Sequence, residues 1–118
     1  MQEAPKRVVV SDTSPIRYLV LMQLEVLLER LYGRVLIPQA VAAELQRPRT
    51  PQAVQAWMDG PPPWIEVLPS RLETLTHTIS TALDPGEQAA LQLALQVQAD
   101  LVLIDERAGA VEAVSYTH

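Results

Sequence analysis

Four short apolar segments, separated by stretches of helical character, constrain the fold of this chain more than any other feature. They are Val8–Val10, Val35–Ile37, Trp64–Leu68 and Leu101–Ile104. Val8–Val10 and Leu101–Ile104 are continuously apolar, which is typical of strands that are buried on both faces of a parallel sheet. Strands that alternate with helices form βαβ crossovers, so the pattern predicts an α/β fold with a parallel sheet.

Proline and capping residues mark the helices between these strands. Ser14 followed by Pro15 predicts a helix start, with Ser14 as the N-cap and Pro15 at the first helical position. The apolar stretch Ile16–Tyr32 is long enough for two helices with a bend near Gln23. Further helices are predicted over Pro38–Leu45, Pro51–Met58, Leu72–Leu83, Asp84–Gln98 and Arg107–Val114.

The composition indicates one globular domain and excludes several kinds of site. Of the 118 residues, 48% are hydrophobic and 19% are charged, so we expect a single domain over residues 1–118. The chain has no cysteine, which excludes disulfides, thiolate metal sites and cysteine nucleophiles. Its two histidines, His77 and His118, are too few for a multi-histidine zinc site.

The charge balance limits the partners that the chain can attract. With 9 basic and 14 acidic residues the net charge is −5, so no broad basic surface is available to capture nucleic acid. Local arginines or bound cations would have to hold any polyanion. No apolar run approaches the ~20 residues of a membrane span, and the opening residues do not resemble a signal peptide. We therefore expect a cytoplasmic protein without membrane association.

Two aspartates follow two of the predicted strands. Asp12 lies two residues after Val10, and Asp105 directly follows Ile104. The carboxyl ends of parallel strands share one edge of the sheet, so neighbouring strands would bring these two side chains close together. Aspartate also forms turns and caps after strands, and this interpretation stays open for each residue taken alone.

Two glutamates lie on the apolar faces of predicted helices. Glu44 shares a face with Val41 and is expected to point inward, with a solvated last turn as the alternative. Glu87 is followed by apolar residues at spacings of three, four and seven, so it heads the stripe that faces the sheet. Asp84, Pro85 and Glu87 also fit a capping box, and both roles are compatible in one helix.

Four inward carboxylates would repel one another strongly unless a cation lay between them. Ligands that are all oxygen atoms select a hard cation such as Mg²⁺ or Mn²⁺. Such ions polarise phosphoryl oxygens and generate hydroxide from bound water. The acidic residues therefore predict metal-dependent chemistry at a phosphate group.

Four segments carry a more specific pattern. They are VVSDTSPI (residues 9–16), LYGRVLIPQAVAAEL (31–45), LDPGEQAALQLA (83–94) and LVLIDERA (101–108). In content and order they resemble the PIN-domain family, most closely its small prokaryotic branch related to VapC-type toxins. The resemblance implies a three-layer α/β/α sandwich with a parallel central sheet of about four strands. It also implies Mg²⁺- or Mn²⁺-dependent endonucleolytic cleavage of RNA.

The resemblance assigns the four acids of the family's site, in order, to Asp12, Glu44, Glu87 and Asp105. Asp84 competes for the third place, but the family's G-E-x-x-A pattern favours Glu87. The two aspartates are expected to bind the metal directly. The two glutamates are expected to complete the catalytic set, directly or through water, with Glu87 counted as a metal ligand. Thr13 or Ser14 takes the hydroxyl position beside the first acid, where it would contact the substrate.

Arginines are the candidates for phosphate contacts. Arg107 is the best placed, two residues after Asp105, although a solvated surface arginine is the alternative. The others are Arg7, Arg17, Arg47 and Arg49. The stretch Tyr18–Leu31 has more apolar residues than one core-facing stripe requires. This excess indicates a homodimer surface or an antitoxin groove, with simple burial as the alternative.

The sequence departs from the family pattern after Ala108. Ala110 occupies the position of a family arginine, and few residues follow it, so we expect the family's last strand and helix to be missing. A second hypothesis is therefore a catalytically inactive, truncated module that keeps a dimer or antitoxin interface. A phosphoacceptor signalling domain ranks third. Such a domain normally needs a lysine after a late strand, whereas the only lysine of this chain, Lys6, precedes the first strand.

Overall fold

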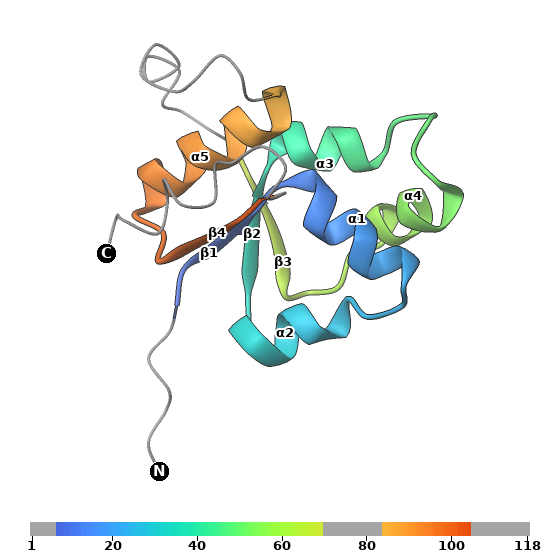
Figure 1. Ribbon diagram of the computed structural model, residues 1–118, viewed down its shortest axis with the longest axis horizontal. Helices are drawn as coiled ribbons and strands as arrows, with labels where there is room; N and C mark the ends of the chain where they lie inside the picture. Colours follow the sequence, from blue (N-terminus) through green and yellow to red (C-terminus); the bar gives the residue numbers. More distant parts are fainter. Residues whose placement is uncertain (1–6, 70–83, 105–118) are drawn as a thin grey trace.

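The computed structural model of the chain describes residues 7–69 and 84–104. Within these ranges the strands are β1 (Val9–Ser11), β2 (Val35–Pro38), β3 (Ile65–Leu68) and β4 (Leu101–Leu103). The helices are α1 (Thr13–Leu21), α2 (Val26–Tyr32), α3 (Gln39–Leu45), α4 (Gln52–Asp59) and α5 (Pro85–Val97). Helices connect successive strands along the chain (Figure 1), as the sequence predicts.

The strands form one parallel sheet in the order β3-β2-β1-β4. β1 lies inside the sheet, where Val10 pairs with Leu36 of β2 and Ser11 pairs with Leu103 of β4. Because all pairs are parallel, the carboxyl ends of the strands lie at the same edge. The parallel α/β fold predicted from the sequence is confirmed.

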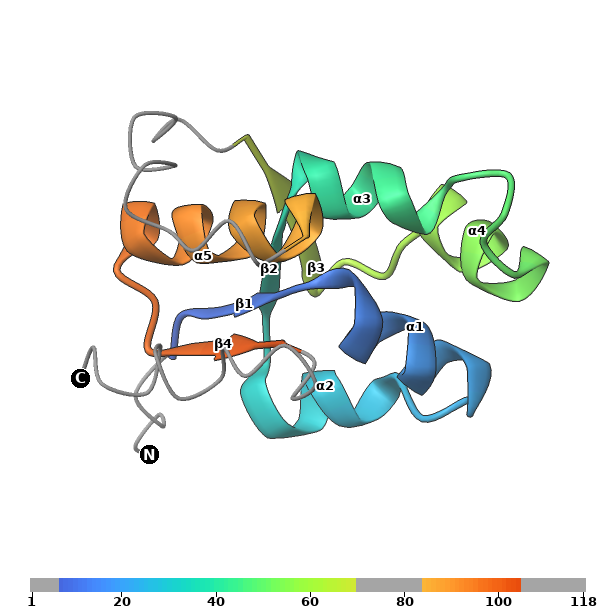
Figure 2. The same cartoon turned by 45° about the horizontal axis from the view of Figure 1, so that its top comes forward.

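Helices cover both faces of the sheet (Figure 2), with α5 on one side and α1 and α2 on the other. Successive side chains of β1 point to opposite faces, so Val9 and Val10 enter two different apolar clusters. Val9 packs in the cluster that contains Ile16 of α1. Val10 packs in the cluster that contains Ala90 and Leu93 of α5. These layers are those of the α/β/α sandwich.

The region after β1 confirms one prediction and corrects another. The stretch Ile16–Tyr32 divides into α1 and α2, and Gln23 between them has a φ of 60°. The helix start, however, is earlier than predicted: Asp12 is the N-cap, not Ser14, and α1 begins at Thr13. Pro15 is tolerated at the third helical position because the first N–H groups of a helix have no intrahelical partner.

The remaining element boundaries agree with the prediction to within one residue at each end. The predicted helices Leu72–Leu83 and Arg107–Val114, and also His77, lie outside the described residues. Trp57 and Trp64 pack against each other with ring centroids 6.2 Å apart. Within the described ranges, no helix combines the length and the apolarity that a membrane crossing requires.

Candidate active site

Asp12 lies at the carboxyl edge of the sheet, where β1 ends and α1 begins. Its backbone N–H donates to the carbonyl oxygen of Leu103 at 2.9 Å, which holds it beside the end of β4. The residue is only 2% exposed, and its Oδ1 atom accepts no hydrogen bond from the described residues. Buried polar atoms without a partner are rare in folded proteins, so this oxygen is free to bind a ligand or an ion.

Glu44 approaches the same place from the last turn of α3. Its Oε1 atom accepts a hydrogen bond from the hydroxyl of Thr13, the residue after Asp12. Its Oε2 atom lies 3.9 Å from a guanidinium nitrogen of Arg47, and the Glu44 side chain is 15% exposed. The prediction that Glu44 points inward is therefore confirmed, and the solvated last turn is not what the structure has.

Gly86, in the first turn of α5, is the point where these elements meet. A Cβ atom at this position would lie 2.5 Å from Oε1 of Glu44 and 3.0 Å from Oδ1 of Asp12. A Cβ essentially never makes a contact this close, so the absence of a side chain lets α5 approach both carboxylates. The residue brings three elements, β1, α3 and α5, to one point.

Asp84 and Glu87 form the capping box that their spacing predicts. The backbone N–H of Glu87 donates to Oδ1 of Asp84 at 2.7 Å, and that of Asp84 donates to Oε1 of Glu87 at 3.0 Å. Glu87 is nonetheless only 6% exposed. One carboxylate oxygen of Glu87 is thus committed to the helix start, while its charge remains close to the buried acids.

The pKa of Asp12 is raised from 3.8 to about 7, mainly because burial disfavours the charged form. The backbone N–H of Thr13 opposes this rise. Neighbouring negative charges raise the pKa further, in decreasing order those of Asp84, Glu87 and Glu44. Ionised Asp12 therefore lies in an environment that favours a positive charge beside it.

A family model described as a PIN domain (DUF3368) matches residues 8–116, which is most of the chain. The chain belongs to the PIN-domain family. PIN domains are generally nucleases that bind RNA and typically use divalent metals. No curated protein and no solved structure matches the chain.

The donor atoms of this PIN domain fit a hard divalent cation. The atoms in question are carboxylate oxygens of Asp12 and Glu44, and one of them is buried with no hydrogen-bond partner in the described part of the chain. Such donors suit Mg²⁺ or Mn²⁺. Within residues 7–69 and 84–104, no three acidic or histidine side chains lie close enough together to form a complete metal-binding group. Asp105, the remaining acid expected from the sequence, lies outside these residues.

The other predicted site residues of the PIN domain are placed as follows. Thr13 contacts the site through Glu44, and Ser14 follows it in the first turn of α1. Arg107 lies outside the described residues. Sequence reasoning missed Gly86, for which the available signal was a glycine inside a helix start, where alanine is more favourable.

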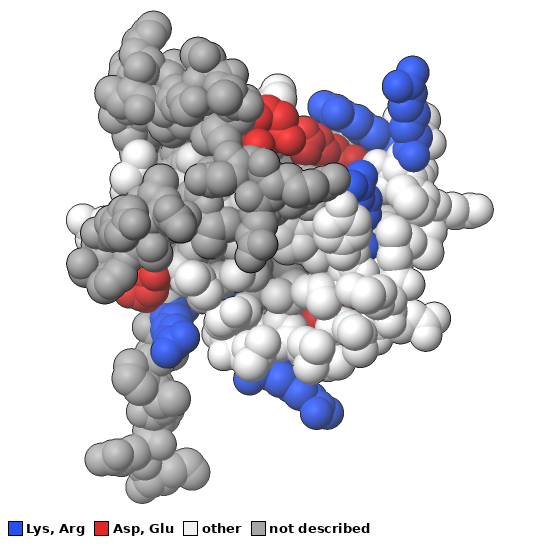
Figure 3. Space-filling model, viewed as in Figure 1, with Lys and Arg blue, Asp and Glu red and all other residues white. Residues whose placement is uncertain are grey.

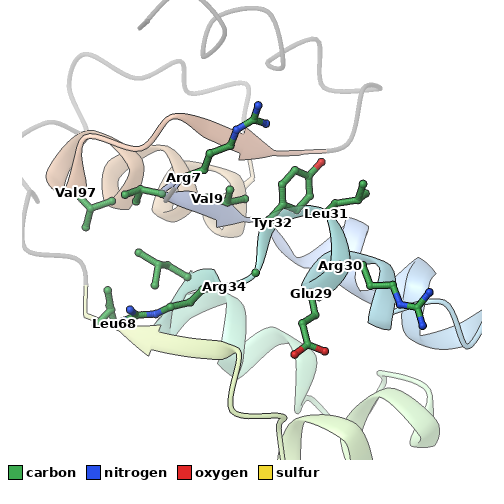
Figure 4. Close-up of a pocket in the computed structure, with 12 residues that line it drawn as sticks. Arg7, Val9, Glu29, Arg30, Leu31, Tyr32, Arg34, Leu68 and Val97 are labelled. Carbon is green, nitrogen blue, oxygen red and sulfur yellow. The ribbon is translucent and has the colours of Figure 1, made fainter. Parts of the chain in front are cut away.

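A cavity of about 950 Å³ (Figure 4) has none of these acids in its lining. Its lining includes Val9 at the start of β1, Arg34 just before β2, and Tyr32 at the end of α2. These positions are at the amino ends of the strands, whereas Asp12 follows the carboxyl end of β1. The cavity of this PIN domain is therefore separate from the candidate active site.

Proposed function

We propose that this PIN domain is a metal-dependent endoribonuclease of the toxin–antitoxin type, related to VapC toxins. The observation that carries the proposal is the buried carboxylate of Asp12. Its Oδ1, which has no hydrogen-bond partner among the described residues, and the Oε1 of Glu44 both face the glycine at the start of α5. A nuclease has to concentrate negative charge in this way if a cation is to hold a phosphate there.

The proposed catalytic set is Asp12, Glu44, Glu87 and Asp105. Asp12, Asp105 and Glu87 would hold Mg²⁺ or Mn²⁺, and Thr13, Ser14 and Arg107 would contact the RNA. The bound ion would supply positive charge at the phosphoryl oxygen and lower the pKa of a bound water. The hydroxyl of Thr13 fixes Oε1 of Glu44, and the capping box fixes Oε1 of Glu87, so neither acid is free to rotate away.

A cleavage assay tests this proposal. The wild type and Asp12→Asn are incubated with structured and with single-stranded RNA, in Mn²⁺ and in EDTA. We expect cleavage by the wild type in Mn²⁺ only, and a loss of more than ~100-fold in Asp12→Asn, because residues that merely orient a ligand already cost up to that much. Asp59→Asn, the same change at an exposed position of α4, should retain full activity. Cleavage that persists in EDTA or in Asp12→Asn would refute the assignment.

One surface favours the second candidate, a catalytically inactive module that binds a second copy or an antitoxin. Seven large apolar side chains on α1, α2 and the turn between them are 39% to 65% exposed. They are Tyr18, Leu21, Met22, Leu24, Val26, Leu27 and Leu31. Exposed large apolar side chains on consecutive elements of this kind are typical of an interface. Light scattering combined with a Mn²⁺ titration separates the two candidates, since metal-dependent cleavage or clear metal affinity contradicts the inactive module.

A further inference from the structure

Two arginines lie in the turn between α3 and α4, beside the candidate active site. Arg47 and Arg49 flank Pro48, and both arginines are exposed. Figure 3 shows basic side chains directly beside acidic ones over this end of α3. The turn therefore provides positive charge at the edge of a cluster of carboxylates.

Hydrogen bonds hold this turn in place relative to Glu44. The hydroxyl of Thr50 donates to the backbone oxygen of Glu44 at 2.8 Å. The backbone N–H of Thr50 donates to the carbonyl of Arg47 at 2.9 Å. The side chain of Gln55, on α4, donates to the carbonyl of Thr50 at 2.6 Å. The backbone that carries the arginines is thus fixed beside the acid, while their side chains extend into solvent.

The contact between Arg47 and Glu44 is a loose one. At 3.9 Å it is longer than a hydrogen bond, and the Arg47 side chain is 63% exposed. Ion pairs at such exposed positions contribute little free energy. A phosphate, in contrast, offers a guanidinium two parallel hydrogen bonds. The guanidinium of Arg47 therefore loses little free energy when it leaves the Glu44 carboxylate, and it gains a stronger hydrogen-bond partner in a phosphate.

The other arginines of the described residues form no ion pair with the candidate acids, and Arg34 pairs with Glu66. Arg7, Arg30 and Arg34 line the cavity at the opposite edge of the sheet. Arg17 lies over the ring of Tyr18, 5.3 Å from its centroid. The chain as a whole carries a net charge of −5, so an RNA strand gains little from long-range attraction. Local cations beside the acids have to hold it.

We propose that Arg47 and Arg49 bind neighbouring phosphates of a single RNA strand beside the carboxylate site, and that Arg47 leaves Glu44 to do so. The substrate class rests on the proposed function. Only one residue separates the two arginines, so their Cα atoms are at most ~7 Å apart. The two side chains therefore start close enough together for both guanidiniums to reach neighbouring phosphates of one strand.

Fluorescence anisotropy with a labelled single-stranded RNA tests the pair, in EDTA so that no cleavage occurs. Each phosphate contact adds about 0.7 to the slope of log affinity against log salt concentration. We expect Arg47→Gln and Arg49→Gln each to lower that slope by ~0.7 and to weaken binding about fivefold at ~0.1 M salt. The double variant loses both contacts. Arg47→Lys keeps the charge and should retain the slope.

Arg30→Gln is the matched control, because it removes the same charge from α2 at the opposite edge. Its slope should equal that of the wild type, and all variants should keep the wild-type melting temperature. The proposal is overturned if the two glutamine variants keep the wild-type slope, if Arg30→Gln lowers it equally, or if the wild type binds no RNA. Arginine-dependent binding without cleavage in Mn²⁺ supports the pair and contradicts the nuclease. Cleavage without arginine-dependent binding supports the nuclease and contradicts the role of the two arginines.

Discussion

The hydroxyl of Thr13 donates a hydrogen bond to Oε1 of Glu44, a residue 31 positions further along the chain. This bond joins the first residue of α1 to the last turn of α3, directly beside Asp12. It holds one carboxylate oxygen of Glu44 in place. The orientation of Glu44 therefore depends on a residue that carries no charge.

Replacement of Thr13 by valine should test this dependence. Valine keeps the branched shape but lacks the donor, so Glu44 loses its fixed orientation. We expect RNA cleavage to fall between ~10- and 100-fold, as for other residues that orient a ligand, and stability to fall by ~2 kcal/mol for a hydrogen bond to a charged group. Thr13→Ser keeps the hydroxyl and should stay close to the wild type. Equal activity in both variants would contradict the role.

The glycine at the start of α5 supplies a second prediction. Gly86→Ala places a methyl group 2.5 Å from Oε1 of Glu44, so that side chain has to move. That movement breaks the hydrogen bond from Thr13 to Glu44, which is worth ~2 kcal/mol, while alanine favours the helix by ~1 kcal/mol, so we expect stability to fall by only ~1 kcal/mol. Cleavage should nevertheless be lost. Gly60→Ala is the control, since nothing lies within 4 Å of a Cβ there.

Stability of the metal-free protein should depend on pH through Asp12. Its folded-state pKa is about 7 against 3.8 in the unfolded chain, so the folded protein binds the proton more tightly. This contribution is complete below about pH 4 and is lost as pH rises through 7, by at most ~1.4 kcal/mol per pH unit. Urea unfolding in EDTA at several pH values measures it. Asp12→Asn should remove this contribution and be more stable than the wild type at pH 8.

Metal binding should restore the stability lost at high pH. At ~100 times its Kd, Mn²⁺ would stabilise the folded protein by about 2.7 kcal/mol. The melting temperature of the wild type at pH 8 should therefore rise on addition of Mn²⁺ and return on addition of EDTA. Asp12→Asn should show no such rise. An equal rise in both proteins would mean that the ion binds elsewhere.

The exposed apolar surface of α1 and α2 predicts a homodimer. Leu31 is its most exposed member at 65%, so Leu31→Glu should leave the fold intact. We expect light scattering to give the mass of a dimer for the wild type and of a monomer for this variant. Leu95→Glu makes the same change on α5, where the leucine is 47% exposed, and should remain dimeric. A wild-type monomer would direct attention to a different partner for this surface.

Much of the fold was predictable because its signals are local. Each strand is a short apolar run, and the capping box of α5 lies within four consecutive residues. The start of α1 was not predictable from the sequence, because Asp12 and Ser14 are equally good N-caps and proline is accepted throughout the first turn of a helix. The residue that the structure uses, Asp12, also bonds through its N–H to Leu103 across the sheet, a contact that no local pattern reveals.

The inward orientation of Glu44 was predictable from the sequence, but the contacts of the candidate site were not. The spacing of apolar residues indicates that Glu44 points inward, as the structure confirms. Nothing in the spacing reveals that Thr13 is its partner, since the two residues belong to different helices. The role of Gly86 is likewise a property of three elements in contact and not of any one segment.

The position of β1 in the sheet has a consequence for the order of events during synthesis. The backbone N–H of Val8 donates to the side chain of Asp100, 92 residues later. The backbone N–H of Asp12 donates to the carbonyl of Leu103 in β4. While the chain grows on a ribosome, β1 emerges early but has no β4 partner until residues 101–103 have been made. Asp12 thus lacks its neighbours on α5 and β4 until those two segments have been made. The backbone of Asp12 therefore gains its hydrogen bond to Leu103 only after the other described strands and helices have been made.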